Sequence, residues 1–191
     1  MTKIGDKNKF AIELSFDDFY NDDWVAFGSF RMFLNGFAYG LKGRGTTYFY
    51  LIVVELRKLI EENIMKKNFF SGYSDKEIID GYLTTFQLTE EERKGKSFLG
   101  LDFNHFVDSF YDFREHTEMA FNDGSCVLMF RDESKVKLLG FKNPFGNKIR
   151  NLNSVEISRE EFDHIIKNTL DTILAERAKA IKNGTAIINY E

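Results

Sequence analysis

The sequence predicts a single domain, residues 1–191, of the α+β class, built on a mainly antiparallel sheet of about six to seven strands. Short segments in which apolar and polar residues alternate fall into two groups, one near the N-terminus and one after residue 117. Two longer segments carry apolar residues at helical spacing, one after the third strand and one near the C-terminus. The chain has one proline, so a proline-rich linker between separate domains is excluded.

The first strand is expected at residues 9–16, because Phe10 and Ile12 alternate with smaller or polar residues in the pattern of a half-buried strand. A loop is expected at residues 17–23, which hold four aspartates. The second strand is expected at residues 24–34, and apolar residues on both of its faces indicate a central position in the sheet.

Three features of the second strand and its turn are expected to be structural. Trp24 is expected to pack into the fold, and Gly28 lets another backbone or a large ring approach closely. Asn35-Gly36 predicts a type I′ turn, because both central positions of that turn need a positive φ. The third strand is expected directly after this turn, at residues 37–41.

A long helix is expected at residues 47–67, with Thr46 or Thr47 as its N-cap. Its apolar stripe at helical spacing consists of Phe49, Ile52, Val53, Leu56, Ile60 and Ile64. Residues 74–77 and 89–92 are capping boxes that predict two further short helices.

Residues 103–116 are expected to form one more helix, because five apolar side chains share a broad face at 100° per residue. The opposite face would carry two imidazoles and two carboxylates, which are side chains that can bind a metal ion: His105, Asp108, Asp112 and His116.

After residue 117, strands are expected at residues 118–121, 126–131, 136–141 and 154–157. Residues 158–161 form a third capping box, which opens the long C-terminal helix. Asn183-Gly184 is expected to end this helix, because it supplies a residue that accepts the left-handed conformation. Residues 185–190 could add an edge strand.

Composition narrows the class of protein. The net charge is −4, and the Lys and Arg residues form no stripe interleaved with aromatic residues, so nucleic-acid binding is not expected. No segment approaches the ~18 apolar residues of a membrane span, and the N-terminus lacks a signal peptide, so a soluble, cytoplasmic protein is expected. Cys126 lies among apolar residues and is expected to be a buried, unreactive thiol.

The acidic loop is the first candidate for a binding surface. Its carboxylates would steer a basic partner and its rings would supply buried anchors, although a solvated turn is the commoner meaning of such a run. A calcium loop is disfavoured, since the glycine at the sixth position and the glutamate at the twelfth are missing. The candidate partner-binding residues are Asp17, Asp18, Phe19, Tyr20, Asp22 and Asp23.

The glycine loop at residues 40–45 is the second candidate. A loop with Lys42, Gly43, Arg44 and Gly45 ahead of a helix N-terminus would favour an anion, because backbone N–H groups and the helix dipole both attract negative charge. The order Gly-x-x-Gly-x-Gly matches neither the dinucleotide fingerprint nor a P-loop, however. Because of these mismatches, a tight strand-to-helix connection is the favoured explanation of the glycines.

Candidates for catalysis and for metal binding are weaker. His105 and His116 would lie about 16 Å apart along a straight helix, so one ion could not bridge them. His164 is expected to be an exposed helix residue, and no nucleophile motif accompanies it. The sequence therefore points to no catalytic residue, no metal site and no cofactor.

The N-terminal part of the chain contains a series of short motifs: Ile4-Gly5, Lys9-Phe10-Ala11-Ile12-Glu13, Trp24, Phe27-Gly28-Ser29-Phe30 and Leu34-Asn35-Gly36. In these motifs the chain resembles the Immunity protein 42 family. The resemblance is clearest over residues 4–47, and residues 70–100 depart from it and are expected to be a divergent helical insertion. Phe10, Ile12, Trp24, Gly28 and the Asn35-Gly36 turn are expected to be architectural.

The resemblance implies a function in bacterial polymorphic-toxin systems, in which a small cytosolic protein binds and neutralises a cognate toxin domain. We therefore expect a non-catalytic immunity-type protein, and a basic, nuclease-type toxin is the partner that the acidic loop would fit. Two alternatives remain: a small-ligand or anion-binding domain that uses residues 40–45, and an enzyme whose site is not recognisable from sequence, which ranks last.

Overall fold

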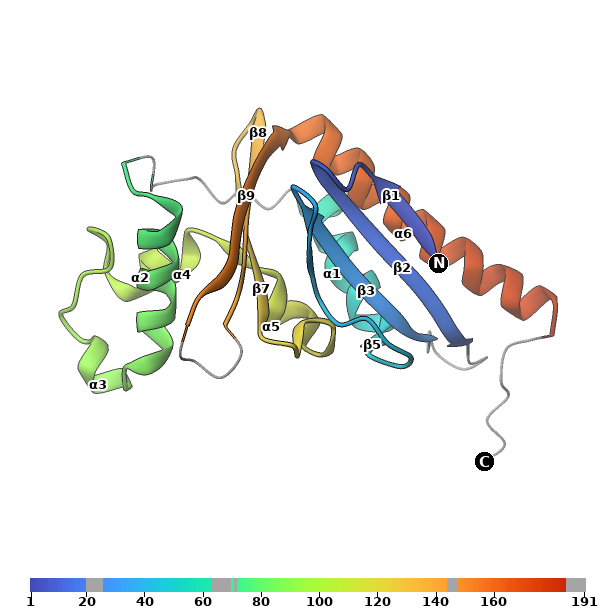
Figure 1. Ribbon diagram of the computed structural model, residues 1–191, viewed down its shortest axis with the longest axis horizontal. Coiled ribbons are helices and arrows are strands. Elements are labelled where there is room, and N and C mark those ends of the chain that lie inside the picture. Colours follow the sequence, from blue (N-terminus) through green and yellow to red (C-terminus); the bar gives the residue numbers. More distant parts are fainter. Residues whose placement is uncertain (20–25, 63–69, 71, 144–147, 185–191) are drawn as a thin grey trace.

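The chain folds into two antiparallel sheets with helices around them (Figure 1). The computed structural model describes residues 1–19, 26–62, 70, 72–143 and 148–184. The first sheet consists of β1 (Thr2–Gly5), β2 (Phe10–Phe19), β3 (Ala26–Leu34), β4 (Phe37–Tyr39) and β5 (Thr47–Tyr48). The second consists of β6 (Tyr111–Asp112), β7 (Ser125–Arg131), β8 (Lys135–Lys142) and β9 (Arg150–Ser158).

The helices pack around these sheets and connect their strands. They are α1 (Phe49–Glu61), α2 (Asp75–Gln87), α3 (Glu90–Arg93), α4 (Phe103–Asp108), α5 (Phe113–Thr117), the 3₁₀ helix η1 (Glu118–Phe121) and α6 (Arg159–Lys182). The α+β class and the two long helices are thereby confirmed. The prediction of one sheet of about six to seven strands was wrong, because the described residues form nine strands in two sheets.

The two sheets meet through single hydrogen bonds rather than through a shared ladder. The Tyr39 hydroxyl donates to the carbonyl of Asn151 over 2.6 Å, and the backbone N–H of Gly40 donates to the Ser125 hydroxyl over 3.1 Å. Gly40 has a φ of 104°, a conformation that turns the chain away at the end of β4. The strands after residue 110 consequently pair only among themselves.

The inner face of the first sheet carries the predicted apolar residues. Phe10 and Ile12 are completely buried, as the alternation in the sequence predicted. In the same core, α1 and α6 pack on this face, and Figure 1 shows both helices behind β2 and β3. Trp24 lies outside the described residues, so its expected packing stays a prediction.

The strand ends differ from the prediction. β2 continues to Phe19, so Asp17 and Asp18 lie in the strand and not in a loop. The ladder to β3 is interrupted between Phe16 and Asp18, and this β-bulge takes Asp17 out of register. β4 ends at Tyr39, two residues earlier than expected. Residues 20–23 lie outside the described part of the chain.

Gly28 and the Asn35-Gly36 turn behave as predicted. Asn35 and Gly36 have φ values of 48° and 85°, the positive values that a type I′ turn requires. A Cβ atom on Gly28 would lie 1.9 Å from the carbonyl oxygen of Ser15 and 2.8 Å from the ring of Phe49. Gly28 therefore permits the close approach of a second backbone and of a large ring.

The helix expected at residues 47–67 begins at Phe49, because Thr47 and Tyr48 pair with β3 as β5. The Thr47 hydroxyl accepts from the backbone N–H of Phe30 over 3.2 Å, so it is not the helix cap. The buried stripe includes Leu59, while Ile60, predicted to face inward, is 37% exposed. Residues 63–67, and Ile64 with them, lie outside the described residues.

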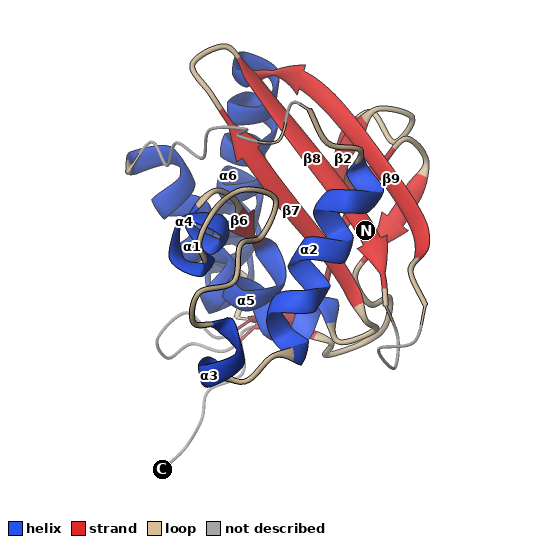
Figure 2. Cartoon of the chain, turned by 90° about the vertical axis from the view of Figure 1, so that its left-hand side faces the viewer, coloured by secondary structure: helices blue, strands red, loops and turns tan. Residues whose placement is uncertain are grey.

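The second sheet is covered on both faces, and all seven residues of β7 are buried. One face joins the core of the first sheet, and the other packs against a second cluster that includes residues of α2 and α4. Figure 2 shows α2 lying across the strands of this sheet. Both predicted capping boxes of this region, Ser74 with Glu77 and Thr89 with Glu92, are confirmed.

The single helix predicted at residues 103–116 is broken into α4, β6 and α5. Tyr111 and Asp112 pair with β7 instead, so this segment joins the sheet. Asp112 is 3% exposed and does not lie on a solvated face. Residues 118–121, predicted as a strand, form the 3₁₀ helix η1. Pairing with β7 gives the backbone of Tyr111 and Asp112 hydrogen-bond partners that the sequence pattern of this segment does not reveal.

The C-terminal half of the fold follows the prediction more closely. β9 begins at Arg150, four residues earlier than expected. The Ser158 hydroxyl accepts from the backbone N–H of Glu161 over 3.1 Å and caps α6, and Gly184 has the expected positive φ of 64°. The helices in the described residues are all too short or too polar to cross a bilayer. Residues 185–190 lie outside the described part.

The outer face of the first sheet contains a buried acid, Glu13, which is 3% exposed. Lys7 and Arg31 donate to its two carboxylate oxygens over 2.5 and 3.0 Å. Burial alone would raise the pKa of Glu13, but the hydrogen bonds and charges of both cations outweigh burial, so the pKa lies below its ordinary value of 4.5.

Acidification is expected to destabilise the fold partly through Glu13. A carboxyl group with a lowered pKa in the folded state contributes stability above its unfolded pKa and loses that contribution as the pH falls through the folded pKa. In urea unfolding between about pH 6 and pH 3, the Glu13→Gln variant should therefore lose less stability than the unsubstituted protein. Parallel pH profiles for the two proteins would contradict this assignment.

Candidate functional site

The acidic segment and the glycine loop, which the sequence treats as separate candidates, meet in the structure. The backbone N–H of Gly45 donates to an Asp17 carboxylate oxygen over 2.7 Å. Arg44 lies 3.3 Å from the carboxylate of Asp18. The ring of Phe19 stacks on Phe16 at a centroid distance of 5.5 Å and packs against the core. These contacts join the end of β2 to the loop before β5.

Tyr20, Asp22 and Asp23 lie outside the described residues, so three of the six predicted partner-binding residues have no position here. Of the other three, Asp17, Asp18 and Phe19 are half-buried. Within the described residues, the predicted acidic surface consists of Asp17 and Asp18 at the end of β2, and Arg44 lies beside Asp18. Their role in binding stays a prediction.

The glycine loop differs from the predicted anion site in two respects. Thr46 and β5 separate the loop from the start of α1, so the loop does not lead directly into a helix N-terminus. Asp17 and Asp18 also occupy the N–H of Gly45 and the guanidinium of Arg44, two of the groups that an anion would need. The Gly43 carbonyl accepts from the Thr46 hydroxyl over 3.2 Å, and Lys42 is exposed. Anion binding at Lys42 to Gly45 stays a prediction.

The candidate metal ligands are not brought together on one face. His105 lies on α4 and contacts Asp102 over 2.5 Å, whereas Asp112 is turned into the core from β6. The side chain of His116 lies outside the described structure. Within the described residues, no three side chains of metal-binding type form a group that could hold an ion. His164 contacts Asn168 over 2.8 Å.

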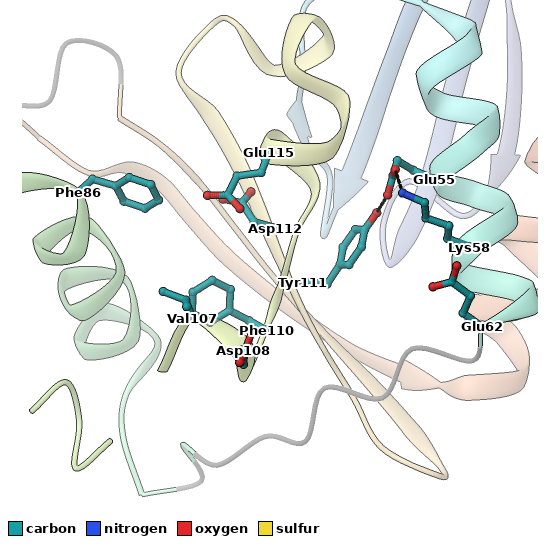
Figure 3. Close-up of a pocket in the computed structure, with 10 residues that line it drawn as sticks. All are labelled: Glu55, Lys58, Glu62, Phe86, Val107, Asp108, Phe110, Tyr111, Asp112 and Glu115. Atoms are coloured by element: carbon teal, nitrogen blue, oxygen red, sulfur yellow. Dashed lines mark hydrogen bonds and ion pairs between the residues drawn. The ribbon is translucent and has the colours of Figure 1, made fainter. Parts of the chain in front are cut away.

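A cleft of about 510 Å³ opens between α1 and the segment formed by α4, β6 and α5 (Figure 3). Figure 3 shows the α1 side chains on one side and Phe86 of α2 on the other. Five carboxylates and a single ammonium group line it, together with four apolar or aromatic side chains. The lining residues are Glu55, Lys58, Glu62, Phe86, Val107, Asp108, Phe110, Tyr111, Asp112 and Glu115. We call this site the acidic cleft.

Hydrogen bonds fix the α1 side of the acidic cleft. Glu55 is only 7% exposed, and it accepts from Lys58 over 2.7 Å and from the Tyr111 hydroxyl over 2.6 Å. The bond to Glu55 and the nearby negative charges of Glu55 and Glu62 raise the pKa of Lys58. Burial and the Glu55 carboxylate also raise the pKa of Tyr111, so its hydroxyl remains a donor to Glu55.

A second network fixes the opposite side of the acidic cleft. The buried carboxylate of Asp112 accepts from the Tyr82 hydroxyl, from the backbone N–H of Arg114 over 2.8 Å and from the Cys126 thiol over 3.5 Å. The Arg114 guanidinium donates to Tyr82 over 2.8 Å and lies 5.3 Å from the ring centre of Phe86. These contacts join α2, β6 and β7 behind the cleft and hold its aromatic wall.

Cys126 is buried, as the sequence predicted. It is 1% exposed, and burial raises the pKa of its thiol well above the usual value. A thiol in this state supplies no thiolate for nucleophilic chemistry.

Sequence reasoning missed the acidic cleft. Its carboxylates come from residue 55 to residue 115 and belong to four separate elements or their ends. One weak signal existed: Glu55 and Glu62 are seven residues apart, which places them on the same side of a helix. Asp108 and Asp112 were assigned to the polar face of a helix that does not form, and Glu115 was not singled out.

Comparison with known proteins identifies the family. A family model described as Immunity protein 42 matches residues 1–172. The crystal structure of CdiI from Burkholderia dolosa AUO158 is similar, with a TM-score of 0.56 and 15% identity over 90% of this chain and 99% of that chain, a likeness that shows the fold alone. Among curated proteins, none matches the sequence. The expectation from the N-terminal residues is thereby confirmed: the chain belongs to the Immunity protein 42 family, and its function is toxin-neutralising immunity.

Proposed function

We propose that this protein neutralises its toxin without catalysis, by forming a one-to-one complex with the toxin domain in the cytoplasm. The observation that supports this proposal best is the acidic cleft, in which five carboxylates surround aromatic and aliphatic side chains. The hydrogen bonds to Glu55 and Asp112 hold this surface in place before a partner arrives, so little ordering is required on binding.

The charge of the acidic cleft selects the chemistry of the partner. Clefts lined by charges of one sign concentrate the field and attract groups of the opposite sign. A toxin that acts on nucleic acid presents lysine and arginine side chains to phosphates, and carboxylates can occupy the same side chains. We therefore propose a basic, nuclease-type toxin, whose substrate surface the acidic cleft would cover.

The edge formed by Asp17 and Asp18 remains a second proposed contact. Both residues are half-buried at the end of β2, and two further acidic residues, Asp22 and Asp23, follow them in the sequence. Because Asp17 holds Gly45 and Asp18 holds Arg44, a lysine at either position would also remove a contact within the protein. Asparagine is therefore the better substitution for testing this edge.

Titration of the toxin's activity tests the proposal. Residual activity of a fixed amount of toxin should fall linearly as the protein is added and should vanish near one molar equivalent, because each toxin molecule is occupied by one inhibitor. With less than one molar equivalent of the protein, the residual activity of the toxin should stay constant over time. Complete inactivation by a small fraction of an equivalent would show catalytic turnover and would overturn the proposal. A failure to restore growth of cells that co-express the toxin would do the same.

A further inference from the structure

A second cleft, of about 780 Å³, opens between α3, the turn that follows it and the start of α4. Among the described residues, it shares no lining side chain with the acidic cleft. Figure 1 shows α3 at the opposite end of the molecule from β1 and the end of α6. Small-molecule sites have volumes of about 300–1,000 Å³, so this cleft has the size of a ligand site. We call it the α3–α4 cleft.

The charge of the α3–α4 cleft is positive. Arg93, Lys94 and Lys96 line it, and in the part of the chain that the structure describes none of these side chains forms an ion pair or a hydrogen bond. Two carboxylates also line the cleft, but Asp102 accepts from the backbone N–H of His105 over 3.0 Å and contacts its ring nitrogen over 2.5 Å. Three cations against two carboxylates favour an anionic ligand, in a chain whose net charge is −4.

An aromatic ring holds the guanidinium of Arg93 in place. The guanidinium carbon lies 4.6 Å from the ring centre of Phe103, and the Nε atom is buried without a hydrogen-bond partner among the described residues. Phe103 in turn packs edge-on against Phe98, which is 5% exposed, with 6.1 Å between the ring centres. The planar fork of donors is therefore oriented before a ligand arrives, so less side-chain entropy is lost on binding.

The turn that carries the two lysines is fixed by its backbone. The N–H of Lys96 donates to the carbonyl of Arg93 over 3.1 Å, and Gly95 between the lysines has a φ of 74°. The pKa of Glu92 is lowered mainly by hydrogen bonds from Thr89, over 2.8 and 2.9 Å, and less by the charge of Lys96. Glu92 thus belongs to the helix cap, and the exposed ammonium groups can turn to a ligand.

We propose that the α3–α4 cleft binds a mononucleotide. The phosphate would lie between Arg93 and the two lysines, because a guanidinium fork and ammonium groups are frequent phosphate ligands in proteins. The face of the guanidinium turned away from Phe103 would stack on the base, as guanidinium planes do in RNA recognition. Glu90 would accept from a sugar hydroxyl, a role that carboxylates have in nucleotide sites. This inference goes beyond the proposed function and uses no residue of the acidic cleft.

The mixed lining of the α3–α4 cleft selects a mononucleotide over other anions. Inorganic phosphate would leave most of a cleft of about 780 Å³ unfilled and would make no use of the stacked guanidinium. An acidic peptide segment would bring its carboxylates toward Glu90 and Asp102, and like charges that meet oppose association. A mononucleotide combines a localised negative charge with sugar hydroxyls, which those two carboxylates tolerate.

Calorimetric titration of the full chain at low salt, with AMP, GMP, CMP and UMP as probes, tests the inference. At least one of them should bind with a Kd below about 1 mM. Adenosine, which has no phosphate, and inorganic phosphate should each bind at least roughly tenfold more weakly than the best mononucleotide, because each lacks one part of the recognised group. Affinity should fall as the salt concentration rises, since salt screens the cations.

Two variants and a control locate the site. Arg93→Gln should weaken binding of the best mononucleotide roughly tenfold or more, because a charged hydrogen-bond donor is lost. Lys96→Gln changes an exposed side chain and should weaken binding without a change in thermal unfolding, so the test does not depend on how well Arg93→Gln folds. Lys182→Gln is the matched control, since it makes the same change of net charge at the end of α6 and should leave the affinity unchanged.

The opposite results are equally definite. The inference is overturned if no mononucleotide binds, if inorganic phosphate binds as tightly as the best of them, or if Arg93→Gln and Lys96→Gln both bind like the control. Loss of toxin binding in these two variants, without any nucleotide binding, would overturn it in favour of an acidic segment of the toxin. The nucleotide titrations contain no toxin, so their failure leaves the proposed function intact.

Discussion

Replacing Gly28 by alanine is expected to lower the free energy of unfolding by at least about 3 kcal/mol. The added Cβ would lie 1.9 Å from the Ser15 carbonyl oxygen and 2.8 Å from the Phe49 ring, and real atoms do not approach so closely. The Ser15 contact is with backbone, so no side-chain rotation relieves it. β2 and β3 would have to separate at the centre of the first sheet, where Phe16 pairs with Gly28.

Urea unfolding measures this effect, and Gly72→Ala is the matched control. Apart from its chain neighbours, no atom of the described residues lies within 4 Å of the position that a Cβ on Gly72 would take, so the control should change the stability by less than about 1 kcal/mol. A second variant that also carries Phe49→Leu should not recover the stability, because the Ser15 contact remains. Equal stabilities of Gly28→Ala and Gly72→Ala would show that β2 and β3 do not approach as described.

Reversing two charges of the acidic cleft is expected to weaken toxin binding roughly a hundredfold or more. Glu62→Lys together with Glu115→Lys would place two positive charges where we propose that basic side chains of the toxin bind. Both positions are exposed, so the fold should tolerate the change. Most of the loss of affinity should come from a lower association rate. This loss should shrink as the salt concentration rises, because salt screens the charges that steer the partners together.

The control for this variant carries the same change of net charge at another place. Glu133→Lys with Asp171→Lys changes two exposed acids on the β7–β8 turn and on α6, outside the acidic cleft. It should bind the toxin with less than about a threefold change, since distant exposed charges are largely screened. Equal losses in both variants would mean that net charge governs binding, and no loss in the cleft variant would remove the cleft from the interface.

The sequence by itself determined the local features whose signals lie within a few residues. The Asn35-Gly36 turn, the caps at Ser74, Thr89 and Ser158, and the glycine after α6 were all predicted from short motifs. The physical reason is that a positive φ or a side-chain cap is decided by the nearest atoms. The burial of Phe10 and Ile12 was likewise predicted from alternation along the strand, whereas the burial of Ala11 and Glu13 on its other face was not.

Tertiary structure alone decided the features that depend on a distant partner. Residues 103–116 have a helical pattern, yet Tyr111 and Asp112 pair with β7, which their own segment cannot reveal. The division into two sheets likewise depends on which strands pair across the turn at Gly40. The joining of Asp17 to Gly45 follows from the β-bulge in β2, which no motif in the segment predicts.

The candidate site belongs to this second class. The acidic cleft gathers acids from residue 55 to residue 115. Motifs record only spacing along the chain, whereas a surface is made by side chains that folding brings together. The sequence therefore determined the family and the local turns and caps, and the packing of distant segments decided where the protein gathers its carboxylates.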